Sequence, residues 1–195
     1  MKKGVAGAAD VVSTYIYPAA GSPRAHSVTT GAKCHELGYD AAGNTTSMPG
    51  SAAQQSMAWT DDGLLDSIGT AAGATQYVYD ADGTQVIRRD PGRATLFVGG
   101  GELTVDTATG VRKGTRHYQG VAIRSGGKLS WISADRHGTA QLAIDQSTLA
   151  VSIRRQDLFG NPRNSAAWPG GTIGFVGGLT NTGTGLTRGG SRVLH

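Results

Sequence analysis

A 20-residue repeat is the feature of this sequence that most constrains its fold. Three segments share one register, with an aromatic residue at positions 39, 59 and 79 and a glycine at positions 43, 63 and 83. The segments are Tyr39–Gly43, Trp59–Gly63 and Tyr79–Gly83. A fixed period of this length indicates an array of similar units, each of which is stabilised by packing against its neighbours.

Each unit carries the residues of a tight turn. Aspartate at the first position of a β-turn accepts backbone hydrogen bonds through its side chain, and glycine is favoured at the fourth position. Asp40 and Gly43 have this spacing, and so do Asp80 and Gly83. The pattern continues at Asp135–Gly138, at Asp157–Gly160 and, one residue longer, at Asp106–Gly110. The sequence therefore predicts a chain of β-hairpins.

The segments that flank these turns alternate apolar and polar residues, as half-buried strands do. Glycine occupies 31 of 195 positions, about twice the average of ~7 %, which favours turns over long helices. A lone hairpin is marginally stable, so neighbouring hairpins must pair. We therefore expect an all-β fold in which hairpins form one long, curved antiparallel sheet. The predicted strands are Val11–Pro18, Gln76–Tyr79, Thr84–Arg89, Ala94–Val98, Gly101–Val105, Val121–Arg124, Lys128–Ser133, Ala140–Ile144 and Ala150–Arg155.

One segment departs from this pattern. Ser51–Met57 has fair helical propensity. Because it lies inside the 20-residue period, we predict a loop followed by a strand, with a helix as the alternative.

The distribution of charge does not favour a nucleic-acid surface. The chain has 18 basic and 14 acidic residues, which gives a net charge of +4. The basic residues come in scattered pairs, such as Arg88–Arg89, Arg112–Lys113 and Arg154–Arg155, whereas nucleic-acid surfaces carry a concentrated basic stripe. We predict that these side chains lie on solvated strand faces, with no nucleic acid as partner.

Signals for disulfides, export and membrane insertion are missing. Cys34 is the only cysteine, so no disulfide can form within the chain. Met1–Lys3 resembles the start of a signal peptide, but Gly4–Asp10 ends in an acid and no apolar region follows. No run approaches the ~20 apolar residues of a membrane span. We predict no membrane span and no targeting signal in this chain.

The repeat resembles the YD repeats of bacterial RHS proteins, on the residues of Tyr39–Asn44 and Tyr79–Gly83. The later part resembles the RHS repeat-associated core domain of actinobacterial members. The matching segments are Tyr77–Pro91, Leu103–Gly110, Trp131–Asp145, Asp157–Arg163, Trp168–Gly170 and Gly174–Gly178. The resemblance covers residues 15–186. It implies YD repeats in residues 1–90, an incomplete core domain in 91–186 and a divergent tail in 187–195.

The resemblance implies both an architecture and a role. In this family, YD repeats spiral into a continuous β-sheet that closes as a hollow shell around a C-terminal toxin. The core domain plugs one end and carries an aspartyl self-cleavage site, built around two Asp-Pro-x-Gly-like segments. This chain would then be part of the shell wall of a secreted or cell wall-associated polymorphic toxin. Its partners would be neighbouring YD repeats and the toxin domain of the full-length protein.

Asn181 departs from the family pattern. It stands in Thr180–Leu186, where related sequences carry Asp-Pro before Thr-Gly-Leu. An amide cannot act as a general base or share a proton with a second carboxylate. The second aspartate segment and the toxin are also absent, so we expect no enzymatic activity.

The two ends of the chain give a further expectation. Neither end reads as a cap for a repeat array, which predicts a truncated piece of a longer reading frame. Open sheet edges expose unpaired backbone groups, so we also expect the chain to self-associate.

Two short motifs suggest chemistry but have simpler interpretations. Cys34-His35 suggests a nucleophile with its base, but adjacent strand residues point to opposite faces. Asp135–Gly138 could supply a base or a metal ligand, but it has the spacing of the repeat turn. We therefore favour structural roles for both.

The remaining candidates are weaker still. The five histidines, at positions 26, 35, 117, 137 and 195, do not have the spacing of zinc ligands. The glycine-rich runs Val98–Gly101 and Gly183–Gly190 lack the lysine of a phosphate loop, and predict hairpin turns and a flexible tail. The sequence therefore predicts no catalytic, cofactor-binding or metal-binding residues.

Aromatic residues leave a second function open. Trp59, Tyr77, Tyr79 and Trp131 could line a sugar-binding face, although aromatic residues at fixed register more often pack across strands. Carbohydrate or cell-surface binding is therefore the alternative to the structural role. Residual aspartyl self-cleavage is a second alternative.

Overall fold

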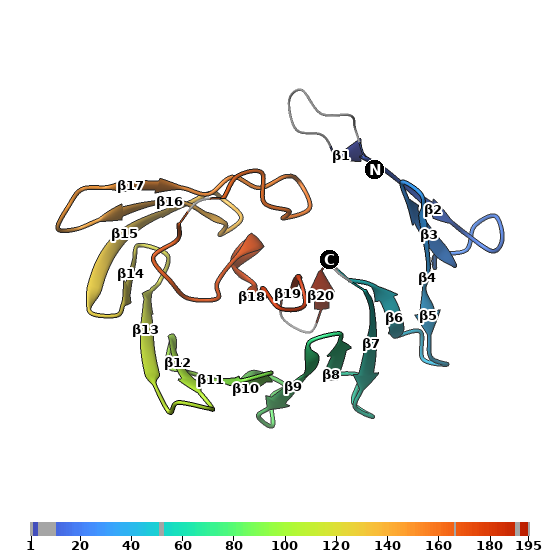
Figure 1. Ribbon diagram of the computed structural model, residues 1–195, viewed down its shortest axis with the longest axis horizontal. Helices are drawn as coiled ribbons and strands as arrows, with labels where there is room; N and C mark the ends of the chain where they lie inside the picture. The colour runs from blue at the N-terminus through green and yellow to red at the C-terminus, as the bar shows by residue number, and fades with distance from the viewer. Residues whose placement is uncertain (1, 4–10, 51–52, 166, 190–191, 195) are drawn as a thin grey trace. The chain divides into compact units, whose positions relative to one another are not determined.

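The computed structural model describes residues 2–3, 11–50, 53–165, 167–189 and 192–194 (Figure 1). By compactness the chain divides into two units, residues 1–75 and 76–195. These units are defined by compactness, whereas the predicted boundaries at residues 90 and 186 separate YD repeats, core domain and tail. Those boundaries stay predictions. No helix in the described ranges is long and apolar enough to cross a membrane.

Strands make up nearly all regular structure in the described part of the chain. The first unit holds β1 (Lys2–Lys3), β2 (Val11–Ile16), β3 (Ser27–Thr30), β4 (Lys33–Glu36), β5 (Gly38–Tyr39), β6 (Thr45–Pro49), β7 (Gln54–Trp59), β8 (Leu65–Thr70) and the start of β9 (Gly73–Tyr79). The second holds the rest of β9, then β10 (Gln85–Asp90), β11 (Arg93–Val98), β12 (Gly101–Asp106), β13 (Arg112–Tyr118), β14 (Ala122–Ser125), β15 (Lys128–Ala134), β16 (Ala140–Asp145), β17 (Val151–Ile153), the 3₁₀ turn η1 (Phe175–Gly177), β18 (Leu179–Asn181), β19 (Leu186–Gly189) and β20 (Arg192–Leu194).

Strand order follows chain order. β1 to β4 form one sheet, β5 to β17 a second sheet of 13 strands, and β18 to β20 a third. The pairing is antiparallel, for example between β11 and β12, where Thr95 lies opposite Thr104 and Leu96 opposite Leu103. The prediction of an all-β fold made of hairpins in a continuous antiparallel sheet is confirmed.

The predicted Asp-to-Gly turns form as expected, each between two neighbouring segments of the chain. The Asp80 carbonyl accepts a hydrogen bond from the Gly83 N–H (3.1 Å), and Asp80 Oδ1 accepts one from the Thr84 N–H (2.8 Å). The turns at Asp40, Asp135 and Asp157 have the same two bonds. The Thr139 N–H makes the largest contribution to holding the pKa of Asp135 below its ordinary value.

The middle repeat uses threonine in place of aspartate. The Thr60 carbonyl accepts from the Gly63 N–H (2.9 Å), and Thr60 Oγ1 accepts from the Leu64 N–H (3.1 Å). Gly63 has a φ of 74°, in the left-handed region where other residues are strained. One turn geometry therefore recurs with different capping oxygens.

Some predictions at the level of single strands need correction. Leu186–Gly189, within the predicted flexible run Gly183–Gly190, is a strand, because β19 pairs with both β18 and β20. β13 was not predicted, since its run of charged residues does not alternate. β7 confirms a strand at Gln54–Met57 and rules out the helix there; Ser51 and Ala52 lie outside the described residues.

A cap that the sequence did not reveal covers the edge of β17. Asn164 Nδ2 donates to the Ile153 carbonyl (2.7 Å), and Asn164 Oδ1 accepts from the Arg155 N–H (2.7 Å). The Arg163 N–H also donates to the Arg155 carbonyl (2.8 Å). The amide side chain therefore takes the place of a neighbouring strand, which protects an edge that would otherwise add another chain.

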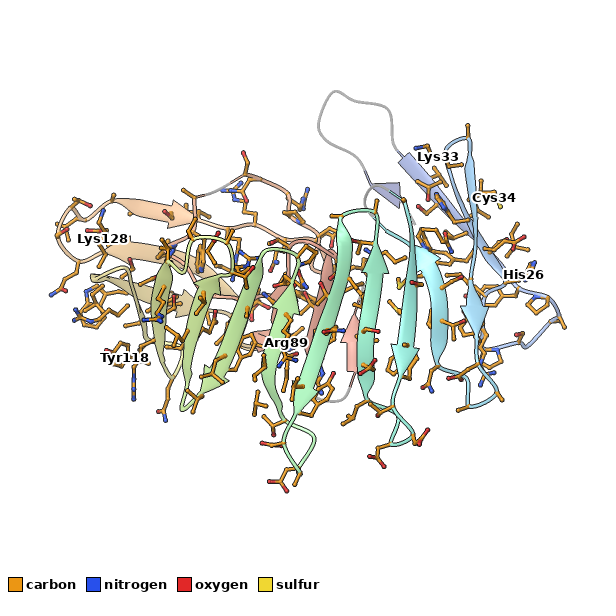
Figure 2. All side chains as sticks on the ribbon, turned by 60° about the horizontal axis from the view of Figure 1, so that its bottom comes forward. His26, Lys33, Cys34, Arg89, Tyr118 and Lys128 are labelled. Atoms are coloured by element: carbon orange, nitrogen blue, oxygen red, sulfur yellow. The ribbon has the colours of Figure 1, made fainter. Side chains whose placement is uncertain are left out.

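The two faces of the second unit's sheet differ in polarity, and the buried face is the more polar one. Buried side chains on the inner face, toward residues 168–189, are largely polar; they include Arg88, Thr95, Glu102, Thr115 and Ser125. The outer face carries the exposed apolar side chains, among them Leu96, Leu103 and Trp131. Figure 2 turns the outer side of β9–β13 toward the viewer. A polar inner face requires polar partners, because unpaired buried groups are costly.

The turn geometry yields a prediction. Gly63→Ala places a Cβ at a positive φ in open space, so strain should lower the free energy of unfolding by about 1 kcal/mol. Gly114→Ala is the matched control, since Gly114 lies within β13 and a Cβ there also meets open space. We expect no loss in the control. Urea unfolding measures both, and equal losses would contradict the strained-turn account.

Candidate functional site

Residues 168–189, here named the covering segment, lie against the inner face of β10–β17 (Figure 1). The segment contains η1, β18 and β19 and includes Asn181, the residue that departs from the pattern in the sequence analysis. Its contacts with the sheet join residues 19 to 105 positions apart in the chain. The region is therefore the candidate site to examine for function.

Asn181 begins a five-residue turn that two aspartates form elsewhere in the sheet. The Asn181 carbonyl accepts from the Gly185 N–H (2.8 Å), and Asn181 Oδ1 accepts from the Gly183 N–H (2.9 Å). Asp106 makes the equivalent bonds with Gly110 and Ala108, and Asp145 with Leu149 and Ser147. Capping this turn therefore needs only a side-chain oxygen, which an amide supplies as well as a carboxylate does.

The other end of the Asn181 amide faces a carboxylate. Asn181 Nδ2 donates to Asp90 Oδ1 (2.9 Å), and Asn181 is only 3 % exposed. Asp90 Oδ2 accepts from Arg88 Nε (2.9 Å), and Arg88 Nη1 donates to the Thr180 carbonyl (3.4 Å). Tyr77 also hydrogen-bonds to Asn181, and burial raises the pKa of the Tyr77 hydroxyl. The buried amide and carboxylate are therefore both satisfied.

This geometry has a chemical consequence. A carboxyl group at position 181 would lie within hydrogen-bond distance of Asp90, and two such carboxyls must share a proton. The amide instead donates a hydrogen bond to Asp90, and an amide does not act as a general acid or base. The arrangement suits a fixed structural contact.

A second anchor joins the covering segment to β12 and β13. Glu102 Oε1 accepts from the Thr172 N–H (2.8 Å) and from Thr172 Oγ1 (3.1 Å), and lies 2.8 Å from His117 Nε2. Burial alone would raise the pKa of Glu102, but the hydrogen bonds from His117 and Thr172 outweigh it and lower the pKa overall. Glu102 is therefore held ionised against the segment.

Further anchors lie at both ends of the covering segment. The Arg154 guanidinium stacks on Trp168, 4.1 Å from the ring centre, and donates to the Ile173 carbonyl (3.4 Å). Arg188 lies over the Tyr79 ring at 4.3 Å and donates to the Gly83 carbonyl (3.2 Å). Burial lowers the pKa of Arg154. The segment is thus attached along its whole length.

Neither short motif supplies a side chain to the contacts of the covering segment described above. Cys34 is exposed on β4 and His35 is half-buried, as expected for neighbours on opposite faces of a strand. Asp135–Gly138 is a repeat turn in which Asp135 Oδ1 accepts from the N–H groups of His137 and Thr139. The turn predicted at Asp135–Gly138 is present, and the structural role of Cys34-His35 stays a prediction.

The aromatic candidates also separate. Trp59 donates its indole N–H to the Thr45 carbonyl (2.8 Å), and Tyr77 and Tyr79 contact the covering segment. Trp131 is 51 % exposed on the outer face. Within the second unit, Tyr77 and Tyr79 therefore do not share a face with Trp131. Within the described ranges, no three His, Cys, Asp or Glu side chains gather as metal ligands would.

Sequence reasoning missed most of the site. No sequence motif pointed to Asp90, Glu102 or His117, because each is brought into the site by a contact with a residue at least 15 positions away in the chain. The one signal that pointed here was Asn181, through its place in the family pattern.

Comparisons with known proteins bear on the fold. No family model and no curated protein matches the sequence. A structure of the Photorhabdus luminescens Tc holotoxin pore, with a mutant TccC3, matches with a TM-score of 0.65 and 16 % identity, over 95 % of this chain and 11 % of that chain. A crystal structure of TcdB2-TccC3 matches with a TM-score of 0.61 and 18 % identity, over 80 % of this chain and 9 % of that chain.

A third structure, of TcdB2-TccC3 without its hypervariable C-terminal region, matches with a TM-score of 0.59 and 16 % identity, over 94 % of this chain and 12 % of that chain. This chain thus spans about a tenth of the length of the chains it matches. At these identities the likeness establishes the fold alone. It supports the RHS-like fold that the repeat predicts and does not extend to features of actinobacterial members.

The Asp90–Asn181 contact yields a prediction. Asn181→Asp should cost about 3 kcal/mol of stability at pH 8, because it buries a second carboxylate beside Asp90. The loss should shrink at pH 4.5, where one of the two carboxyls binds a proton. Thr182→Asp, one residue along and exposed, is the control for added charge. Urea unfolding at both pH values measures the free energy lost in each variant. A loss in Asn181→Asp that does not depend on pH would contradict the predicted pairing with Asp90.

The Glu102 anchor yields a prediction about pH. The folded-state pKa of Glu102 lies below its ordinary value, so its stabilising contribution is present above the unfolded-state value and is lost as pH falls through the folded-state value. The native chain should therefore exceed Glu102→Gln in unfolding free energy at pH 7, and the difference should decline below about pH 4. A difference that stays constant down to pH 3 would refute an ionised anchor.

Proposed function

We propose that this chain is a wall segment of an RHS-type shell, which encloses a C-terminal toxin within a longer, secreted or cell-surface protein. The observation that carries the proposal is the match of 95 % of the chain to part of a Tc holotoxin chain, with hairpins in continuous antiparallel order. The Tyr-Asp turn residues at Tyr39–Gly43 and Tyr79–Gly83 add support from the sequence. In this role the sheet separates the toxin from its surroundings. Neighbouring repeats of the full-length protein would continue the same sheet.

The covering segment fits this role as a fixed part of the wall. Its polar contacts with Arg88, Glu102 and Arg154 satisfy the inner face of the sheet. One related structure was solved without its hypervariable C-terminal region. By analogy, we place the toxin after the segment described here, in the full-length protein.

We further propose that this chain does not cleave itself. The amide of Asn181 is committed to Asp90 and to its own turn, and it offers no acid or base. The purified chain should stay at its full mass of 20.0 kDa when held at pH 5 and pH 8 for a day. Intact-mass spectrometry measures this, with Asp90→Asn as a matched variant. A defined shorter product that disappears in the variant would contradict the proposal.

The wall role is tested at the level of the native protein. We expect sequencing of the locus to find further Tyr-Asp-x-x-Gly turns in frame and a toxin-like region downstream. We also expect that downstream region to resist protease in the native particle and to become sensitive after denaturation. A native product of 20.0 kDa, flanked by unrelated genes, would contradict the wall role.

A further inference from the structure

The positive charge of the chain is concentrated in one stretch. Residues 111–134 hold five basic residues and no aspartate or glutamate, whereas the other residues hold 13 basic and 14 acidic. The five are Arg112, Lys113, Arg116, Arg124 and Lys128. They belong to β13, β14 and β15, which are adjacent in the sheet. By register Arg112, Arg116 and Arg124 lie on the outer face, and Lys113 and Lys128 on the opposite one. Pairing therefore gathers three of these charges on one face.

Two of these side chains lie directly opposite each other. Arg116 pairs with Arg124 across β13 and β14, and both are exposed on the outer face. Neither forms an ion pair within the described part of the chain. Like charges at directly opposed positions destabilise a sheet. The pair thus lacks an internal partner that would offset its cost.

Apolar side chains surround this pair on the same face. Register places Val98, Gly101, Arg116, Arg124 and Leu129 in one row across the sheet. The next row holds Tyr118, Ala122, Trp131, Ile144 and Val151.

Several of these side chains are strongly exposed. Val98 is 66 % exposed, Tyr118 40 %, Trp131 51 % and Val151 57 %. Tyr118 is labelled in Figure 2. We name the group Arg116, Arg124, Tyr118 and Trp131, with its apolar border, the Arg–Trp surface.

We propose that the Arg–Trp surface docks a protein partner whose contact patch carries carboxylates around an apolar centre. Arginine, tyrosine and tryptophan are the residues that dominate binding energy at protein interfaces, and exposed apolar patches mark such interfaces. Charge complementarity sets the partner's sign, since paired guanidinium groups bind carboxylates in bidentate fashion. The proposal does not depend on the wall role.

A second copy of this chain is a poor occupant. A symmetric contact brings the same patch of both copies together, so Arg116 and Arg124 would meet their own counterparts. A bare polyanion is also a poor occupant, because it would leave the apolar border exposed.

The test uses a random 12-residue peptide library, selected against the full chain. We expect the enriched peptides to combine two or more acidic residues with an aromatic or branched apolar residue. Arg116→Glu/Arg124→Glu should weaken their binding at least tenfold, and Trp131→Ala at least fivefold. Arg89→Glu is the matched control on the same face, exposed and outside the surface, and should change binding less than twofold.

Two further measurements keep the result decisive. Arg116→Gln should leave the fold intact and raise the unfolding midpoint, because it relieves like-charge repulsion, so lost binding in this variant cannot come from unfolding. Poly-glutamate and a 20-residue oligo-thymidine serve as bare polyanions. Enriched peptides without acidic residues, binding that survives the double variant, or equal affinity for either polyanion would each overturn the proposal.

Discussion

The side-chain oxygen at the first residue of the repeat turns is the interaction on which this structure depends. It accepts the N–H two to four residues later, which fixes the hairpin and hence the register of both strands. Asp80 does this with a carboxylate, Thr60 with a hydroxyl and Asn181 with an amide. Because the geometry needs only an acceptor, the repeat tolerates a change of residue while keeping the hairpin. That tolerance lets an amide stand at position 181 without loss of the turn.

The amide at position 181 then determines what the inner face can do. The Asn181 amide donates a hydrogen bond to one oxygen of Asp90, while Arg88 contacts the other oxygen. Together with Glu102 and Arg154, this makes the polar inner face a set of attachment points for the covering segment. The polarity of the two faces follows from this. The inner face is polar because the covering segment lies over it with matching polar groups, whereas the outer face has exposed apolar side chains. An outer face of that kind suits contact with other proteins.

Local features could be predicted from the sequence, and non-local ones could not. The turns at Asp40, Asp80 and Asp135 depend on residues within five positions, so composition and spacing were enough. β13 escaped prediction because its strand character comes from pairing with β12 and β14, not from alternation. The contact between Glu102 and Thr172 spans 70 positions and left no signal in either segment. Asn181 was found through a family pattern, but its partner Asp90 emerged only from the fold.

The central claim is that the covering segment is fixed to the sheet by these polar contacts. Hydrogen exchange followed by NMR tests it most directly, at the Asn181 side-chain amide and the Thr172, Val176 and Thr180 backbone N–H groups. Each donates to the sheet or within the segment. The account predicts that they exchange as slowly as amides in the centre of β11 and β12. Exchange as fast as in exposed loops, with the sheet still protected, would show that the segment is not held and would contradict the account.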